Sequence, residues 1–171
     1  DELKAFQRSA GFLRSNPRHI KRLINVYSFA RTLAKYKKKQ PILDNPLVMI
    51  LWLVICGQWP YTMHLMLYRF DKMPTEDLES LSDKDPLIYL LEEVKKNPDF
   101  LRNKQSKLDH DSDLLERLLH ENEGLLTWSQ LEDLRQFTIN FNPAIEAELK
   151  FEGEIKEEAD SPHVSGSSDV Y

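Results

Sequence analysis

The sequence has little cysteine and glycine and no long apolar run. Cys56 is the only cysteine, and five glycines are spread over 171 residues. A single cysteine excludes a disulfide-stapled scaffold, a two-cysteine redox motif and a zinc site built mainly on thiolates. The longest apolar run, from Leu47 to Gly57, is about half of the roughly 20 residues that a membrane-spanning helix needs. We therefore expect a buried core helix there and no transmembrane span.

The glycines also exclude P-loop chemistry in this chain. None of the five stands before a Lys-Ser or Lys-Thr pair, so no loop can wrap a phosphate with its backbone amides in the P-loop manner. No apolar run ends in an acidic pair suited to magnesium and water activation. We expect neither ATP hydrolysis nor any other enzyme activity from this chain alone.

Two histidines lie beside carboxylates. His110 stands between Asp109 and Asp111, and His120 precedes Glu121. Neither a His-x-His nor a His-Glu-x-x-His spacing is present, so we expect a charged loop leading into an amphipathic helix and no metal site. Cys56 follows a run of aliphatic residues, where a buried thiol behaves as a small hydrophobe and not as a nucleophile.

Charge is segregated along the chain. The net charge of -5 divides into +9 for residues 1–40, -9 for residues 41–151 and -5 for residues 152–171. The last block is rich in Glu, Ser and Gly and cannot bury enough apolar surface to order itself. We therefore predict a helical region over residues 1–151, made of a basic head and an acidic body, and a disordered acidic tail over residues 152–171.

Proline placement predicts where helices begin. Five of the nine prolines follow Asn or Asp, at Asn16-Pro17, Asn45-Pro46, Asp85-Pro86, Asn97-Pro98 and Asn142-Pro143. A side-chain acceptor at the N-cap and a proline in the first helical position both suit a helix start. Thr127 and Gln130 add a capping box and a sixth start. With no strand-period segment longer than Phe137–Phe141, the sequence predicts an all-α fold.

The predicted helices differ in how much of their surface is apolar. The helix from Pro17 to about Lys39 is expected to bury one face, formed by Ile20, Leu23, Ile24, Tyr27, Ala30 and Ala34. The segment from Pro46 to Cys56 is apolar all round, which predicts burial on most sides, with Gly57 as its C-cap. Shorter helices are expected over 60–70, 86–96 and 113–121, with a mobile charged connector over 103–111.

The opposite face of the first long helix is basic. Arg18, Lys21, Arg22 and Asn25 fall together there, and Arg18 lies in the first turn, where a helix N-terminus favours anions. This face suits the phosphates of a nucleotide, a nucleic acid or an anionic lipid. A solvated face that complements the acidic body explains the same residues, and both interpretations remain open. For Lys37 to Lys39 we expect a solvated helix end.

Three weaker signals involve aromatic or terminal residues. Trp59 and Tyr61 flank Pro60 and suit either an aromatic binding platform or the core; the apolar context favours the core. Ser161-Pro162 is a candidate phosphorylation site. A carboxylate at Tyr171 suits a groove that captures peptide C-termini.

Four blocks of sequence together resemble a known family. They are residues 16–25 (NPRHIKRLIN), Leu51-Trp52-Leu53, Gln58-Trp59-Pro60-Tyr61 and residues 134–143 (LRQFTINFNP). Their order resembles the C-terminal helical part of KAP-family P-loop NTPases. The resemblance covers residues 3–70, the lid-like part, and 125–150, the C-terminal helices, and leaves an acidic helical insert over 71–124. The family's nucleotide-binding core is missing, and the chain opens without Met, so we expect a piece of a longer protein.

The resemblance implies a helical lid next to an α/β core that binds ATP and magnesium in the complete parent. Arg18 matches the arginine of the lid motif and would sense nucleotide phosphates, with Lys21 and Arg22 beside it. The other motif residues would be structural: Asn16, Pro17, Asn25, Gln58, Trp59, Pro60 and Tyr61. The implied function is nucleotide-dependent regulation and protein assembly in a signalling scaffold, with the chain's own NTPase core and other proteins as partners. Its implied location is the cytosol, with a membrane tether outside this chain.

The charge pattern favours an alternative from a different class. An autonomous helical adaptor would bind an acidic protein partner or an anionic membrane surface through its basic N-terminal helix. Nucleic acid is not expected as a partner, because the acidic body would repel phosphates and no recognition motif is present.

Overall fold

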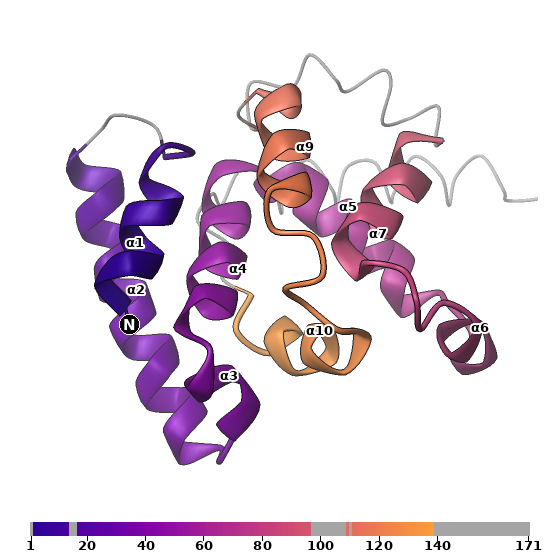
Figure 1. The fold of residues 1–171 in the computed structure, drawn as a ribbon, viewed down its shortest axis with the longest axis horizontal. Helices are drawn as coiled ribbons and strands as arrows, with labels where there is room; N and C mark the ends of the chain where they lie inside the picture. Colours follow the sequence, from indigo (N-terminus) through magenta and orange to yellow (C-terminus); the bar gives the residue numbers. More distant parts are fainter. Residues whose placement is uncertain (1, 14–16, 97–108, 110, 139–171) are drawn as a thin grey trace, which may run out of the picture. The chain divides into compact units, whose positions relative to one another are not determined.

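The computed structural model of the chain describes residues 2–13, 17–96, 109 and 111–138. Within these ranges every regular element is an α-helix, so the predicted all-α class is confirmed (Figure 1). The helices are α1 (Glu2–Ala10), α2 (Pro17–Tyr36), α3 (Gln40–Asp44), α4 (Pro46–Gln58), α5 (Pro60–Asp71), α6 (Thr75–Ser80), α7 (Pro86–Lys95), α9 (Ser112–His120) and α10 (Trp128–Arg135). All of them belong to one compact unit, Asp1–Phe141.

Several sequence predictions fall outside the described residues. They are the helix starts at Pro98 and Pro143, most of the 103–111 connector, the tail over 152–171, Ser161-Pro162 and Tyr171. Asn16 and His110 also fall outside.

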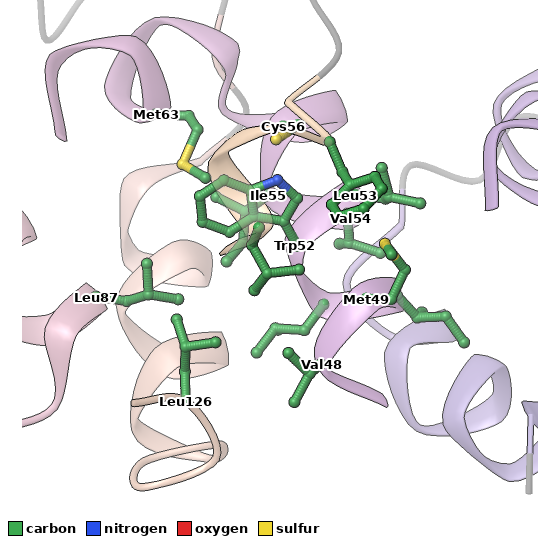
Figure 2. Packing of buried hydrophobic residues seen from close by; sticks show 14 of the residues in the cluster. Val48, Met49, Trp52, Leu53, Val54, Ile55, Cys56, Met63, Leu87 and Leu126 are labelled. Atoms are coloured by element: carbon green, nitrogen blue, oxygen red, sulfur yellow. The ribbon is translucent and has the colours of Figure 1, made fainter. Parts of the chain in front are cut away.

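The core is built around α4. Ten of its thirteen residues are buried, which leaves the helix without a solvent-facing side and confirms the prediction made from its apolar run. The helices α1, α2, α3 and α5 all pack against it. Leu87 and Leu126, from later segments, approach α4 near Trp52 and Val48 (Figure 2). Residues far apart in sequence therefore share one hydrophobic core.

Two of the predicted caps form as expected. The Asp85 carboxylate accepts hydrogen bonds from the backbone N–H groups of Leu87 and Ile88 at 3.0 and 3.1 Å. Thr127 and Gln130 form the capping box at the start of α10. Asn45 also precedes a helix, but its side chain makes no capping hydrogen bond. At the start of α4, therefore, only Pro46 in the first turn agrees with the predicted Asn-Pro helix start.

The long helix α2 buries a narrower stripe than predicted. Its buried residues are Leu23, Tyr27, Ala30 and Ala34, whereas Ile20 and Ile24 are 40% and 45% exposed. Each residue turns a helix by about 100°, so this spacing defines a narrow contact line and leaves the two isoleucines at its edge. The helix also ends at Tyr36, earlier than predicted, because Lys38 takes the left-handed backbone conformation with φ of 56°.

The prediction that Gly57 caps α4 is wrong. The helix continues through Gly57 to Gln58, and the N–H of Trp59 donates to the Ile55 carbonyl oxygen at 2.9 Å. Pro60 then begins α5. The chain therefore turns at Trp59, two residues later than expected.

The sequence reading also missed the helices α1, α3 and α6. The first is tied to α2: the Tyr27 hydroxyl donates to Oε1 of Glu2 at 3.0 Å, and Arg31 forms an ion pair with the same carboxylate. The Phe6 ring meets the Tyr27 ring edge-on, with the centroids 5.2 Å apart. These contacts fix α1 against the inner side of α2.

Candidate functional site

The basic face predicted on α2 is present and exposed. Arg18, Lys21, Arg22 and Asn25 are all exposed and lie away from the stripe that packs on the core. The first turn of α2 carries no acidic side chain. The N-terminal end of the helix dipole and the cations therefore favour an anion on the same side.

Two lysines just beyond the end of α2 have partners within the molecule. Lys39 pairs with Asp133 at 2.5 Å, and the Lys37 ammonium donates to Oε1 of Gln136 at 2.8 Å. Both lie beyond the end of α2. Lys37 and Lys38 are exposed, as expected for a solvated helix end, whereas Lys39 is partly buried against Asp133 and departs from that expectation. A third contact between the basic head and the acidic body comes from α1, where the Arg8 guanidinium donates to the Glu121 carbonyl oxygen at 2.9 Å. Arg18, Lys21 and Arg22 lie at the opposite end of α2 from Lys37 and Lys39.

Three residues of the Gln58-Trp59-Pro60-Tyr61 block are buried in the protein. Trp59 is completely buried, and Gln58 and Tyr61 are each 4% exposed. The block forms the junction of α4 and α5, whose axes bend by 114°. These burial values match the interpretation of Trp59 and Tyr61 as core residues and leave no room for an aromatic binding platform.

The start of α5 is capped from a distant part of the chain. The Asp109 carboxylate accepts hydrogen bonds from the N–H of Tyr61 at 2.8 Å, and from the N–H and hydroxyl of Thr62 at 2.9 and 2.6 Å. Trp59 donates its indole N–H to the carbonyl oxygen of Asp111 at 2.9 Å. We call Asp109, Asp111 and the α5 start the Asp109 clamp. Asp109, which the sequence analysis considered as a metal ligand beside His110, thus lies at the N-terminus of α5 and binds its backbone N–H groups.

One local signal pointed toward this clamp. Trp59 holds the N-cap position of α5, and its side chain makes no cap hydrogen bond. Since tryptophan has no acceptor to offer the free N–H groups of a helix start, an acceptor must come from elsewhere. Nothing in the sequence near Trp59 identifies Asp109 as that acceptor.

The structure also describes the surroundings of His120, Cys56 and a small internal space. No three His, Cys, Asp or Glu side chains could hold a metal ion within the described ranges, and His120 is exposed on α9. Cys56 is buried in the core. A small apolar space between α4, α7 and α10 includes Trp52, whose Nε1 is buried without a hydrogen-bond partner. Apart from Trp52 the lining of this space is aliphatic, so it offers no charged group and no hydrogen-bond acceptor side chain to a ligand.

In the described part of the chain no single helix is long and apolar enough to cross a membrane. The bent pair α4 and α5 passes that test of length and composition only when taken together. Comparison of the chain with family models, curated proteins and solved structures found no match. The resemblance to the KAP family therefore remains a prediction.

Proposed function

We propose that this chain is the non-catalytic helical region of a KAP-like P-loop NTPase, and that the first turns of α2 meet the phosphates of a nucleotide held by a separate core. The observation that supports this most directly is the exposure of Arg18, Lys21 and Arg22 together at the start of α2. A guanidinium and a helix N-terminus on one side are a suitable pair for a phosphate group.

The rest of the fold suits a rigid support for that helix. The helix α2 packs on α4, and the turn from α4 into α5 is held by the buried Trp59 and by the Asp109 clamp. A charge that draws Arg18 toward a nucleotide would move these helices as one body. The nucleotide state of the core would in this way set the position of the helical region.

Each of the two motif blocks thus has its own role. The buried Gln58-Trp59-Pro60-Tyr61 block fixes the frame, and the exposed Arg18-Lys21-Arg22 group makes the contact. ATP and its magnesium ion would be held by the core, which lies outside this chain.

The test is Arg18→Ala in the full-length parent, with nucleotide affinity and turnover measured together. Loss of one charge-assisted hydrogen bond is expected to lower affinity or turnover by roughly tenfold to a hundredfold. Lys35→Ala is the matched control, since it removes a cation from the same helix about 25 Å away along the axis. Unchanged affinity and turnover in Arg18→Ala would refute the proposed role.

A further inference from the structure

A second exposed feature lies along the outward side of α2. We call it the α2 aromatic stripe, formed by Asn25, Phe29, Thr32 and Tyr36, all of them exposed. Phe29 is 65% exposed and Tyr36 is 85% exposed. Tyrosine and phenylalanine bury large areas when they find a partner, so two exposed rings on one helix face mark a candidate contact surface.

The stripe is one continuous line on the helix. Its residues follow one another at intervals of four, three and four, which keeps them within about 60° around the axis. They lie opposite the stripe that packs on the core, which includes Leu23 and Ala30. In Figure 1 this helix lies at the left edge of the view, beside α1 and α4.

The two aromatic rings of the stripe lie beyond the proposed phosphate contact, although Asn25 belongs to both the basic face and the stripe. Tyr36 stands eighteen residues after Arg18, which corresponds to about 27 Å along the helix axis. Phe29 stands seven residues after Arg22, which is about 10 Å along the axis. A single nucleotide phosphate beside Arg18 therefore does not cover either ring. The exposed rings therefore need an occupant of their own.

Charge and spacing indicate what that occupant is. All charged side chains of α2 are cationic, and Lys35 and Lys38 lie exposed around Tyr36. Spacing of four and three residues is that of the seam between two packed helices. Aromatic residues and arginine are also the side chains that contribute most at protein interfaces. We infer that the α2 aromatic stripe binds an acidic amphipathic helix of a partner protein, with its apolar side chains against Phe29 and Tyr36.

A lipid surface fits this stripe less well. Helices that lie in a membrane interface bury a broad apolar face containing several large side chains. Here the two aromatic rings are separated by the polar Thr32 and preceded by the polar Asn25. That arrangement offers two anchor points and hydrogen-bonding groups between them, which suits a protein helix.

In the experiment, a displayed library of helix-length peptides is selected for binding to the immobilised 171-residue chain. The affinity of the enriched peptides for the chain is then measured by fluorescence anisotropy. Enriched peptides are expected to be acidic, with apolar residues three and four apart, and to bind more weakly as salt is raised. Phe29→Ala and Tyr36→Ala should each weaken binding by at least about tenfold. Tyr68→Ala is the matched control, because Tyr68 is 58% exposed on α5. Circular dichroism verifies that each variant folds.

Three outcomes would overturn the inference. The first is that the selection yields no peptide that binds. The second is that peptide affinity is the same for the native chain, Phe29→Ala and Tyr36→Ala. The third is that both substitutions weaken binding of the chain to phosphatidylserine vesicles but not its binding to the peptides. The nucleotide assay distinguishes this inference from the proposed function. Phe29→Ala should leave turnover in the parent unchanged, and failure of the Arg18→Ala test would remove the phosphate role without affecting peptide binding.

Discussion

Replacing Asp109 by alanine tests whether a distant carboxylate holds the start of α5. The substitution removes the acceptor for three donors, which are two backbone N–H groups and the Thr62 hydroxyl. Tyr61 and Thr62 are each 4% exposed, so water has little access to the donors left behind. Trp59 offers no replacement, because its side chain makes no capping hydrogen bond.

The expected cost follows from these contacts. Loss of an N-cap costs about 1 kcal/mol, and each buried donor left without a partner adds roughly 1–3 kcal/mol. Since the contributions overlap, we expect Asp109→Ala to lower the free energy of unfolding by about 2–4 kcal/mol, or roughly 5–15 °C in Tm. Asp109→Asn keeps one acceptor oxygen and should lose about half as much.

Thermal and urea unfolding followed by circular dichroism measure the effect. Asp83→Ala is the control, since Asp83 is exposed and the substitution removes the same charge. Thr62→Val, alone and combined with Asp109→Ala, gives a double-mutant cycle in which we expect a coupling of about 1 kcal/mol or more. If Asp109→Ala unfolds within about 0.5 kcal/mol of Asp83→Ala, the clamp contributes nothing to stability and the reasoning is wrong.

Two further predictions concern the core and the contact between α1 and α2. Leu53→Ala should lower the free energy of unfolding by about 2–5 kcal/mol, because Leu53 is completely buried, whereas Leu3→Ala, at a position 68% exposed, should change it by less than about 0.5 kcal/mol in urea unfolding. Burial raises the pKa of Tyr27 above 10.0, so its stabilising contribution is complete below pH 10 and is lost as the pH rises through the folded-state pKa. The free energy of unfolding, measured in urea between about pH 9 and pH 11, should therefore fall more steeply with pH for the native chain than for Tyr27→Phe. Equal dependence on pH in the two proteins would contradict this prediction.

Local signals in the sequence predicted the helix starts and the most buried helix. Proline at the first helical position identified α2, α4, α5 and α7, and the capping box identified α10, because each signal lies within a few residues of its helix. The helices α1 and α6 have no such proline, and α3 contains only five residues, too few to show a periodic pattern. The helix α1 packs against α4, and α3 packs against α2 and α4, so both depend on contacts distant from their own sequence.

The candidate surface was predictable in part. Helical periodicity placed Arg18, Lys21, Arg22 and Asn25 on one face, and the same periodicity extends to Phe29 and Tyr36. The positions of Ile20 and Ile24 were not predictable, because the width of a buried stripe depends on which neighbouring helix covers it. The Asp109 clamp was not predictable either, since it joins residues 47 and 48 positions apart.

Charge segregation has a spatial counterpart along α2. At the C-terminal end, Lys37 and Lys39 connect to α10, so part of the positive charge of the basic head is used in holding the chain together. Arg18, Lys21 and Arg22 are exposed at the other end, on the face turned away from α4. Substitution of Lys37 or Lys39 should therefore lower the free energy of unfolding, because each substitution removes a hydrogen bond to α10 or to the residue that ends it. Lys35→Ala removes an exposed cation from the same helix and is the comparison. Equal midpoints of urea unfolding for Lys39→Ala and Lys35→Ala would show that the Lys39–Asp133 pair contributes nothing to stability.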